Sequence, residues 1–278
     1  MSAVLPPAAA TPALARVPAL RVTQRRVLLS EFTKFRSLRS TMWTLLAAVV
    51  LMIGLGALFS AANASQYHTR TAAAMAGFDP VTASLNGVIF AVVAFGVLGV
   101  LLMGGEYSTG MIRSSLTAVP RRLPVLWGKL AVFAGSIFPV SLVASFLSFF
   151  LGQALLNSHH LGVSITAHDA LRSVIGAALY LTVAGLIGVA LGALLRHTAA
   201  GITTFASLFF VIPLLARWLP ASISSHLGPY LPPNAGGAIW GGVDVPNPLS
   251  PWTGFALVCG YAAVLIGAGA WRLRRSDA

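Results

Sequence analysis

Long runs of apolar residues, separated by shorter polar connections, dominate the pattern along the chain. A helix needs about 20 apolar residues to cross the hydrocarbon core of a membrane, and six runs reach or approach that length. None of them carries a charged side chain in its middle. They cover residues 41–62, 84–105, 130–156, 173–195, 201–219 and 252–271. The pattern predicts an all-α integral membrane protein with six transmembrane helices.

The stretch before the first run has the pattern of a helix that lies along the membrane surface. Within residues 24–40, the side chains of Leu28, Phe32 and Phe35 recur at the spacing of one helix face. Basic residues such as Lys34 lie away from that face, where they can approach anionic lipid headgroups. We therefore expect an N-terminal interfacial helix, with a simple charged anchor beside the membrane as the alternative interpretation.

The connection after the second run predicts a further short helix. Glu106 stands at the end of an apolar run, where a carboxylate needs water or a partner. Ser108 or Thr109 can cap a helix that Pro120 would end, which predicts a helix over 108–119. Such a helix is apolar on one side and too short to bury that side alone. It therefore needs the membrane surface or another protein.

The connection between the fifth and sixth runs, residues 217–251, is long and rich in proline, glycine and aromatic residues. Structureless connections of this length are uncommon, and tryptophan and tyrosine favour the membrane interface. We expect short interfacial or re-entrant helices near 220–228 and 234–241.

Composition excludes a water-soluble protein. The 278 residues are 57% hydrophobic and only 9% charged, whereas soluble domains carry about 25% charged residues. The formal net charge of +12 fits nucleic-acid or membrane-surface contact. The apolar runs favour the membrane, so lipid is the expected partner and nucleic acid is not.

The placement of the basic residues predicts the orientation. Of 18 lysines and arginines, 15 lie before the first run, after the sixth, or in the connections after the second and fourth. The three on the other side are Arg70, Arg172 and Arg217. By the positive-inside rule, both termini face the cytoplasm and the protein lies in the cell membrane. Residues 1–23, rich in proline and alanine, are expected to be a disordered lead, and residues 24–278 to form one transmembrane domain.

Catalytic signatures are absent from the sequence. It has no phosphate-binding G-x-x-x-x-G-K-[ST], no H-E-x-x-H and no G-x-S-x-G. His159, His160 and His168 with Asp169 offer zinc-ligand chemistry, but their spacing matches no closed site, which favours chance histidines in a polar loop. We expect no catalytic residues, no metal and no cofactor on this chain. Uncharged span interiors also argue against an ion-driven transporter.

Residues 104–130 resemble the permease subunits of ABC-2 type transporters. In those proteins a glutamate follows the second span, and a Gly-[Thr/Met] pair, a short helix, a proline, basic residues and a Gly-Lys pair come after it. The matching positions here are Glu106, Gly110-Met111, Leu116, Pro120, Arg121-Arg122 and Gly128-Lys129. The segments 30–46 and 230–236 are also similar to actinobacterial members, so the resemblance extends over nearly the whole chain from residue 24.

The resemblance implies an ATP-driven exporter that moves an apolar or amphipathic substrate by alternating access. Two permease subunits, identical or different, would pair, and each would dock a separate cytoplasmic ABC ATPase that carries ATP and magnesium. The 108–119 helix would be the coupling helix, with the contact residues Glu106, Tyr107, Ser108, Thr109, Gly110, Met111, Ile112, Arg113 and Leu116. Beside it would lie the interfacial-helix residues Leu28, Glu31, Phe32, Lys34 and Phe35. Spans two and five would line the pathway, with candidates Asn86, Phe90, Thr203, Thr204 and Phe209.

Two other functions stay open on the sequence. A non-transporting membrane anchor or assembly protein would have no ATPase partner and would tolerate changes at Glu106. An intramembrane enzyme that modifies lipid would depend on the histidines of the 159–168 loop and would survive disruption of 108–119. Neither explains a short apolar helix between Glu106 and Pro120.

Overall fold

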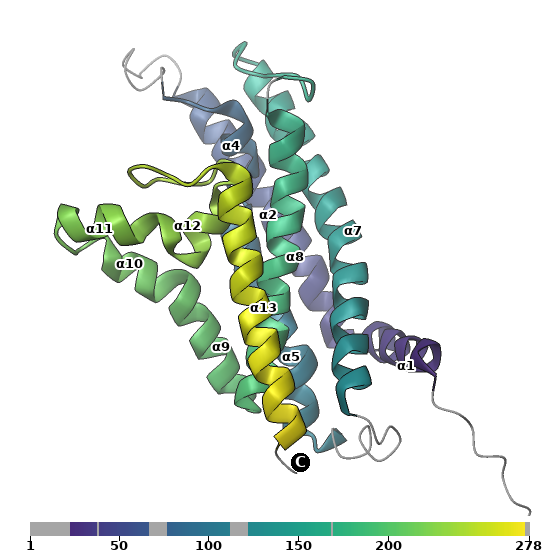
Figure 1. Ribbon diagram of the computed structural model, residues 1–278. Helices are drawn as coiled ribbons and strands as arrows, with labels where there is room; N and C mark the ends of the chain where they lie inside the picture. The colour runs from purple at the N-terminus through teal and green to yellow at the C-terminus, as the bar shows by residue number, and fades with distance from the viewer. Residues whose placement is uncertain (1–22, 38, 67–76, 112–121, 168, 276–278) are drawn as a thin grey trace, which may run out of the picture.

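The computed structural model describes residues 23–37, 39–66, 77–111, 122–167 and 169–275. Within these residues every regular element is a helix (Figure 1). The elements are α1 (Gln24–Ser37), α2 (Arg39–Ser65), α4 (Pro80–Leu85), α5 (Val88–Ser108), α7 (Arg122–Asn157), α8 (Ala170–Leu195), α9 (Thr198–Ala206), the π-helix η2 (Ser207–Val211), α10 (Ile212–Ala216), α11 (Ala221–Leu227), the 3-10 helix η3 (Gly228–Tyr230), α12 (Pro232–Gly237) and α13 (Pro251–Arg275).

Six segments of the described chain are long and apolar enough to cross a membrane, which confirms the predicted all-α membrane fold. They are Arg39–Ser65, Pro80–Ser108, Leu123–Asn157, Ala170–Leu195, Thr198–Ala216 and Pro251–Arg275. The third span begins seven residues before the predicted start at 130. Its first two turns contain basic and aromatic residues that hydropathy alone assigns to the preceding connection.

The spans run side by side, and the two ends of the bundle differ (Figure 1). One end carries α1, the start of α9 and the end of α13, and we call it the α1 end. The other carries α4, α11 and α12, and we call it the α11 end. Toward the α11 end, α9 and α10 slant away from the other spans, and α11 and α12 lie between α10 and α13. α11 lies within the predicted range 220–228, whereas α12 begins before the predicted range 234–241 and ends at Gly237, inside it.

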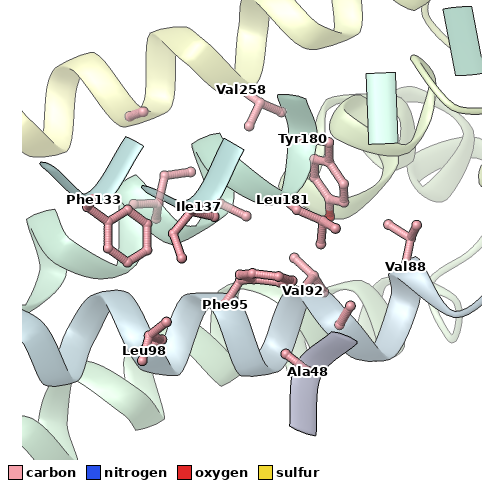
Figure 2. Packing of buried hydrophobic residues seen from close by; sticks show 14 of the residues in the cluster. Ala48, Val88, Val92, Phe95, Leu98, Phe133, Ile137, Tyr180, Leu181 and Val258 are labelled. Carbon is pink, nitrogen blue, oxygen red and sulfur yellow. The ribbon is translucent and has the colours of Figure 1, made fainter. Parts of the chain in front are cut away.

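Helices α5 and α8 form the centre of the bundle because small residues let their backbones approach closely. A Cβ atom at Gly99 would overlap the Gly185 carbonyl oxygen, and one at Gly188 would overlap the Gly96 carbonyl oxygen. Small residues serve this purpose in membranes, where the hydrophobic effect does not drive helices together. Larger side chains fill the space around the contact, among them Phe95, Leu98, Phe133 and Ile137 (Figure 2).

Hydrogen bonds between side chain and backbone join α4 to α7 at the α11 end. The Gln153 amide donates to the Pro80 carbonyl oxygen and to the Ser84 hydroxyl, both at 2.8 Å. Its own oxygen accepts from the Val163 backbone N–H at 2.8 Å. Ser148 donates to the Ser84 carbonyl oxygen at 2.7 Å. Ser148 and Gln153 of the third span thus pair with polar groups of neighbouring segments.

Candidate functional site

Helix α1 packs against α7 through a face that includes a carboxylate. Its buried residues are Val27, Glu31 and Phe35, one helical turn apart. The predicted apolar stripe lies beside this face: Phe35 is buried, Leu28 is half-buried and Phe32 is exposed. The buried face differs from the apolar stripe because Glu31 has charged partners on the other helices.

Four charged side chains meet where α1 packs against α7, beside the end of α5, and we call them the charge network. They are Glu31 and Lys34 of α1, Glu106 of α5 and Lys129 of α7. The Lys129 Nζ lies 2.6 Å from Glu31 Oε2 and 2.7 Å from Glu106 Oε1. The Lys34 Nζ lies 2.8 Å from Glu31 Oε1 and 3.2 Å from Glu106 Oε1. Each lysine therefore bridges both carboxylates.

Three of the four side chains of the charge network are buried, where an unpaired charge is energetically unfavourable. Lys129 is 1% exposed, Glu31 5% and Glu106 8%, whereas the Lys34 side chain is 29% exposed. Isolated charges at such depth are very unfavourable, but two lysines and two glutamates sum to zero and satisfy one another. Glu106 Oε2 is buried and has no hydrogen-bond partner among the described residues. The charge network is therefore neutral as a whole and sensitive to the loss of any of its three buried members.

The surroundings of Lys34 displace its pKa. Burial alone lowers the pKa of the Lys34 ammonium, but the Glu31 hydrogen bond and the negative charges of Glu106 and Glu31 outweigh it. The pKa of Lys34 is therefore raised above its ordinary value, and Lys34 is protonated throughout the physiological range.

The Gly128-Lys129 pair has a clear structural role. A Cβ atom at Gly128 would lie 3.0 Å from Val27 Cγ1, tighter than ordinary packing, so the glycine lets α1 approach α7. The adjacent Lys129 then reaches both carboxylates. Sequence reasoning counted Lys129 among the basic residues and within the family pattern, but did not identify it as the partner of Glu31 and Glu106.

The end of α5 lies directly beside the charge network. Helix α5 continues through Glu106 and Tyr107 to Ser108. The hydroxyls of Ser108 and Thr109 donate to the Gly105 carbonyl oxygen at 3.0 and 2.8 Å. Gly110 follows with φ of +71°, the left-handed conformation that commonly ends a helix. Ser108 and Thr109 therefore contribute to the end of α5.

Most of the predicted coupling helix lies outside the described residues. Met111 is exposed and helical, whereas Ile112, Arg113 and Leu116 belong to the segment 112–121, which is not among them. The charge network frames this connection on both sides, since Glu106 precedes it and Lys129 follows it. A displacement of the connection would therefore move α1, α5 and α7 together.

A second contact ties α5 to α8 and α13 at the α1 end. The Arg196 guanidinium lies over the Tyr107 ring, 5.5 Å from its centre, a cation–π geometry. Arg196 also donates to the Arg272 carbonyl oxygen at 3.4 Å, and Arg272 donates to the Leu194 carbonyl oxygen. Tyr107, predicted at the partner contact, here packs between helices.

The structure gathers two of the five predicted pathway residues at one place. Asn86 and Phe209 both line a cavity of about 720 Å³ at the α11 end. Phe90 stacks on Phe59 with ring centres 6.4 Å apart, and it is absent from the lining. Thr203 and Thr204 are exposed on α9, and Thr203 donates to its own helix backbone.

The loop histidines form no metal cluster in the part of the chain that the structure describes. No group of three histidine, cysteine, aspartate or glutamate side chains gathers there, and His168 lies outside the described residues. Asp169 accepts a hydrogen bond from Arg172 Nε at 3.0 Å, which occupies one of its carboxylate oxygens.

Comparison with known proteins agrees with the fold and with the resemblance seen at residues 104–130. Residues 27–216 match the model of a family described as "ABC-2 family transporter protein", and this range includes most of α1, the charge network and the first five spans. No curated protein matches the chain. The family match covers well over half of the sequence, so the chain belongs to the ABC-2 family of transporter proteins and is a membrane-spanning permease.

Proposed function

We propose that this permease docks a separate cytoplasmic ABC ATPase at its α1 end and exports an apolar or amphipathic substrate. The observation that supports the proposal is the charge network, which joins α1, α5 and α7 on both sides of the 109–121 connection. An ATPase that moves this connection displaces three helices at once. The mechanical energy of ATP hydrolysis thereby reaches the spans.

The α1 end is the cytoplasmic end in this proposal. Along the sequence, 15 of the 18 basic residues fall before the first span, after the sixth, or in the connections after the second and fourth, which the positive-inside rule assigns to the cytoplasmic side. Two permease copies, identical or different, would provide one docking site each for the two ATPases. ATP and magnesium would bind only the ATPase, since this chain has no phosphate-binding loop.

Co-purification tests the ATPase partner. The tagged chain is isolated from its native host in mild detergent, and the proteins that accompany it are identified by mass spectrometry. We expect an ATP-binding subunit with the native chain and its loss from Glu106→Gln and Gly110→Pro. Glu106→Gln removes a charge from the network, and proline cannot adopt the positive φ of Gly110.

The control variant is Gln153→Leu, which disrupts buried hydrogen bonds at the opposite end of the bundle. It should retain the ATPase even where its stability is reduced. A preparation of the native chain without any ATPase would overturn the proposal and favour the membrane-anchor function. An activity on lipid that depends on His159 or His160 would favour the enzyme.

Cysteine labelling tests the orientation. Cys259 is the only cysteine, so a Cys259→Ala background gives a blank. In intact cells, a membrane-impermeant maleimide should label Ser250→Cys at the α11 end and should label Gln24→Cys only after lysis. The reverse pattern would place the α1 end outside.

A further inference from the structure

The cavity at the α11 end is built entirely from one chain. Its walls come from the start of α5, the middle of α8, the η2–α10 segment and the region from α11 to residue 246. Its volume of about 720 Å³ falls within the 300–1,000 Å³ typical of small-molecule sites. α9 and α10 slant away from the other spans here, and α11 and α12 lie between α10 and α13 (Figure 1).

Hydrogen-bonding groups without protein partners face this cavity. Tyr180 is only 3% exposed and lines the cavity, yet its hydroxyl has no hydrogen bond within the described residues. The side-chain amide of Asn86, another lining residue, likewise has no partner among them. Trp240 also lines the cavity, but its indole N–H is buried away from the open volume and has no acceptor among the described residues. Polar groups inside a protein normally find a partner, so the Tyr180 hydroxyl and the Asn86 amide indicate a ligand or water.

The interior of the cavity carries no charge. Among the lining residues only Arg217 and Asp244 are charged, and they lie 3.9 Å apart with side chains 65% and 98% exposed. They therefore mark the mouth and neutralise each other. The remaining wall includes Ile89, Val92 and Phe210. An ion would lose its hydration here without gaining a counter-charge, so the interior suits an uncharged molecule.

Aromatic side chains close the cavity toward the α1 end. The rings of Phe209 and Phe205 stack with centres 4.4 Å apart, and both are buried. Phe205 lies so close to α5 that a Cβ atom at Gly96 would overlap its ring. Phe209 belongs to the π-helix η2, an irregularity frequent at functional sites. The cavity therefore has a polar wall, apolar sides and an aromatic floor.

We infer that this cavity binds one uncharged amphipathic small molecule per chain, with a ring system against Phe209 and a polar group near Tyr180 and Asn86. The inference rests on the proposed export function, for which it specifies the substrate class. The lining residues found in the structure all belong to one subunit, so the expected stoichiometry is one molecule per chain. The uncharged interior excludes an ionic ligand.

Binding of a matched pair of fluorescent probes tests the inference. N-phenyl-1-naphthylamine is neutral and has an aromatic body with one N–H donor, and 8-anilinonaphthalene-1-sulfonate adds an anionic group to the same skeleton. The purified full chain is placed in phosphatidylcholine nanodiscs. Energy transfer from tryptophan to each probe is titrated, and the signal of empty nanodiscs is subtracted. We expect saturable binding of the neutral probe at one per chain, at least about tenfold tighter than the anion.

Variants localise the probe. Tyr180→Phe and Asn86→Leu each remove one hydrogen-bonding group, so at least one should weaken binding about 2- to 12-fold. Ile89→Trp fills the cavity and should abolish saturable binding. Its matched control is Phe90→Trp, which adds the same side chain at the next position of α5, outside the lining. Thermal unfolding of every variant confirms that it is folded.

Three results would overturn the inference: no saturable binding above empty nanodiscs, equal binding to the native chain and Ile89→Trp, or one probe per two chains. Preference for the anionic probe would refute the uncharged class. These measurements use the chain without an ATPase, so their failure is separate from a failure of ATPase co-purification.

Discussion

Lys129→Met should destabilise the protein far more than the same change at Lys34. Both ammonium groups contact Glu31 and Glu106, at 2.6 and 2.7 Å for Lys129 and at 2.8 and 3.2 Å for Lys34. Lys129 is 1% exposed, so its removal leaves the two buried carboxylates with only Lys34, whose side chain is 29% exposed. Breaking a buried pair in this way costs about 3–5 kcal/mol. The more exposed Lys34 should contribute no more than about 1 kcal/mol.

The assay is unfolding in mixed micelles, with the mole fraction of sodium dodecyl sulfate as the variable and circular dichroism as the signal. Methionine preserves much of the lysine volume, so lost packing contributes little. A double variant, Lys129→Met with Glu106→Gln, removes one charge of each sign and should recover part of the loss, with a coupling of about 0.5–3 kcal/mol. Equal effects at Lys129 and Lys34, or strict additivity in the double variant, would refute the account of a neutral buried network.

Three further predictions concern other parts of the molecule. Gly188→Ala should destabilise by about 1–3 kcal/mol, because its Cβ atom would overlap the Gly96 carbonyl oxygen; Gly54→Ala, with nothing within 4 Å, should be neutral in the same micelle titration. Gln153→Leu should lower the free energy of unfolding by about 1–2 kcal/mol, since it removes three hydrogen bonds worth about 0.6 kcal/mol each between membrane segments; an unchanged midpoint would contradict this. The pKa of Lys34 is raised in the folded state, so its contribution to the free energy of unfolding is complete below about pH 10.4 and is lost as the pH rises through the folded-state pKa. The free energy of unfolding of the native chain should therefore exceed that of Lys34→Met by a constant amount from about pH 7 to 9 and by less at higher pH. An excess that grows with pH would contradict the raised pKa.

The spans were predictable because their apolar composition is a local property. Boundaries were less so where polar residues belong to a helix. The third span was expected from residue 130, yet α7 begins at Arg122. Without knowledge of its carboxylate partners, the sequence places Lys129 in a basic connection outside the membrane. A hydropathy pattern cannot identify a buried lysine, because it predicts that every charged side chain is exposed to water.

The charge network could not be assembled from the sequence because its members are far apart in the chain. The Lys129–Glu31 and Lys129–Glu106 pairs are separated by 98 and 23 residues, and Lys34–Glu106 by 72. Helical periodicity identifies neighbours three or four residues apart and nothing beyond. Glu31, Lys34 and Glu106 were each expected near the ATPase, and Glu106 was expected to need a partner. The apolar stripe of α1 also led us to expect Phe32 on the buried face, where the structure has the adjacent Glu31.

The cavity illustrates a different limit. Asn86 and Phe209 were expected together because spans two and five line the pathway in the family. Tyr180 and Trp240 were not expected, since α8 reads as a packing helix and residues 217–251 as an interfacial loop. Only the crossing of α11 and α12 over the spans brings these residues to one wall.

The spacing of the charge network along the chain also sets an order of events during synthesis. Ribosomes add about 5–20 residues per second, so Lys129 is made about 1–5 s after Glu106 and about 5–20 s after Glu31. Until then both carboxylates lack their most buried partner, and α1 has no surface on α7 to occupy. The nascent chain therefore holds α1 at the membrane surface until the third span is inserted. A long insertion into the 109–121 connection would extend that interval and expose the half-made protein to quality-control proteases.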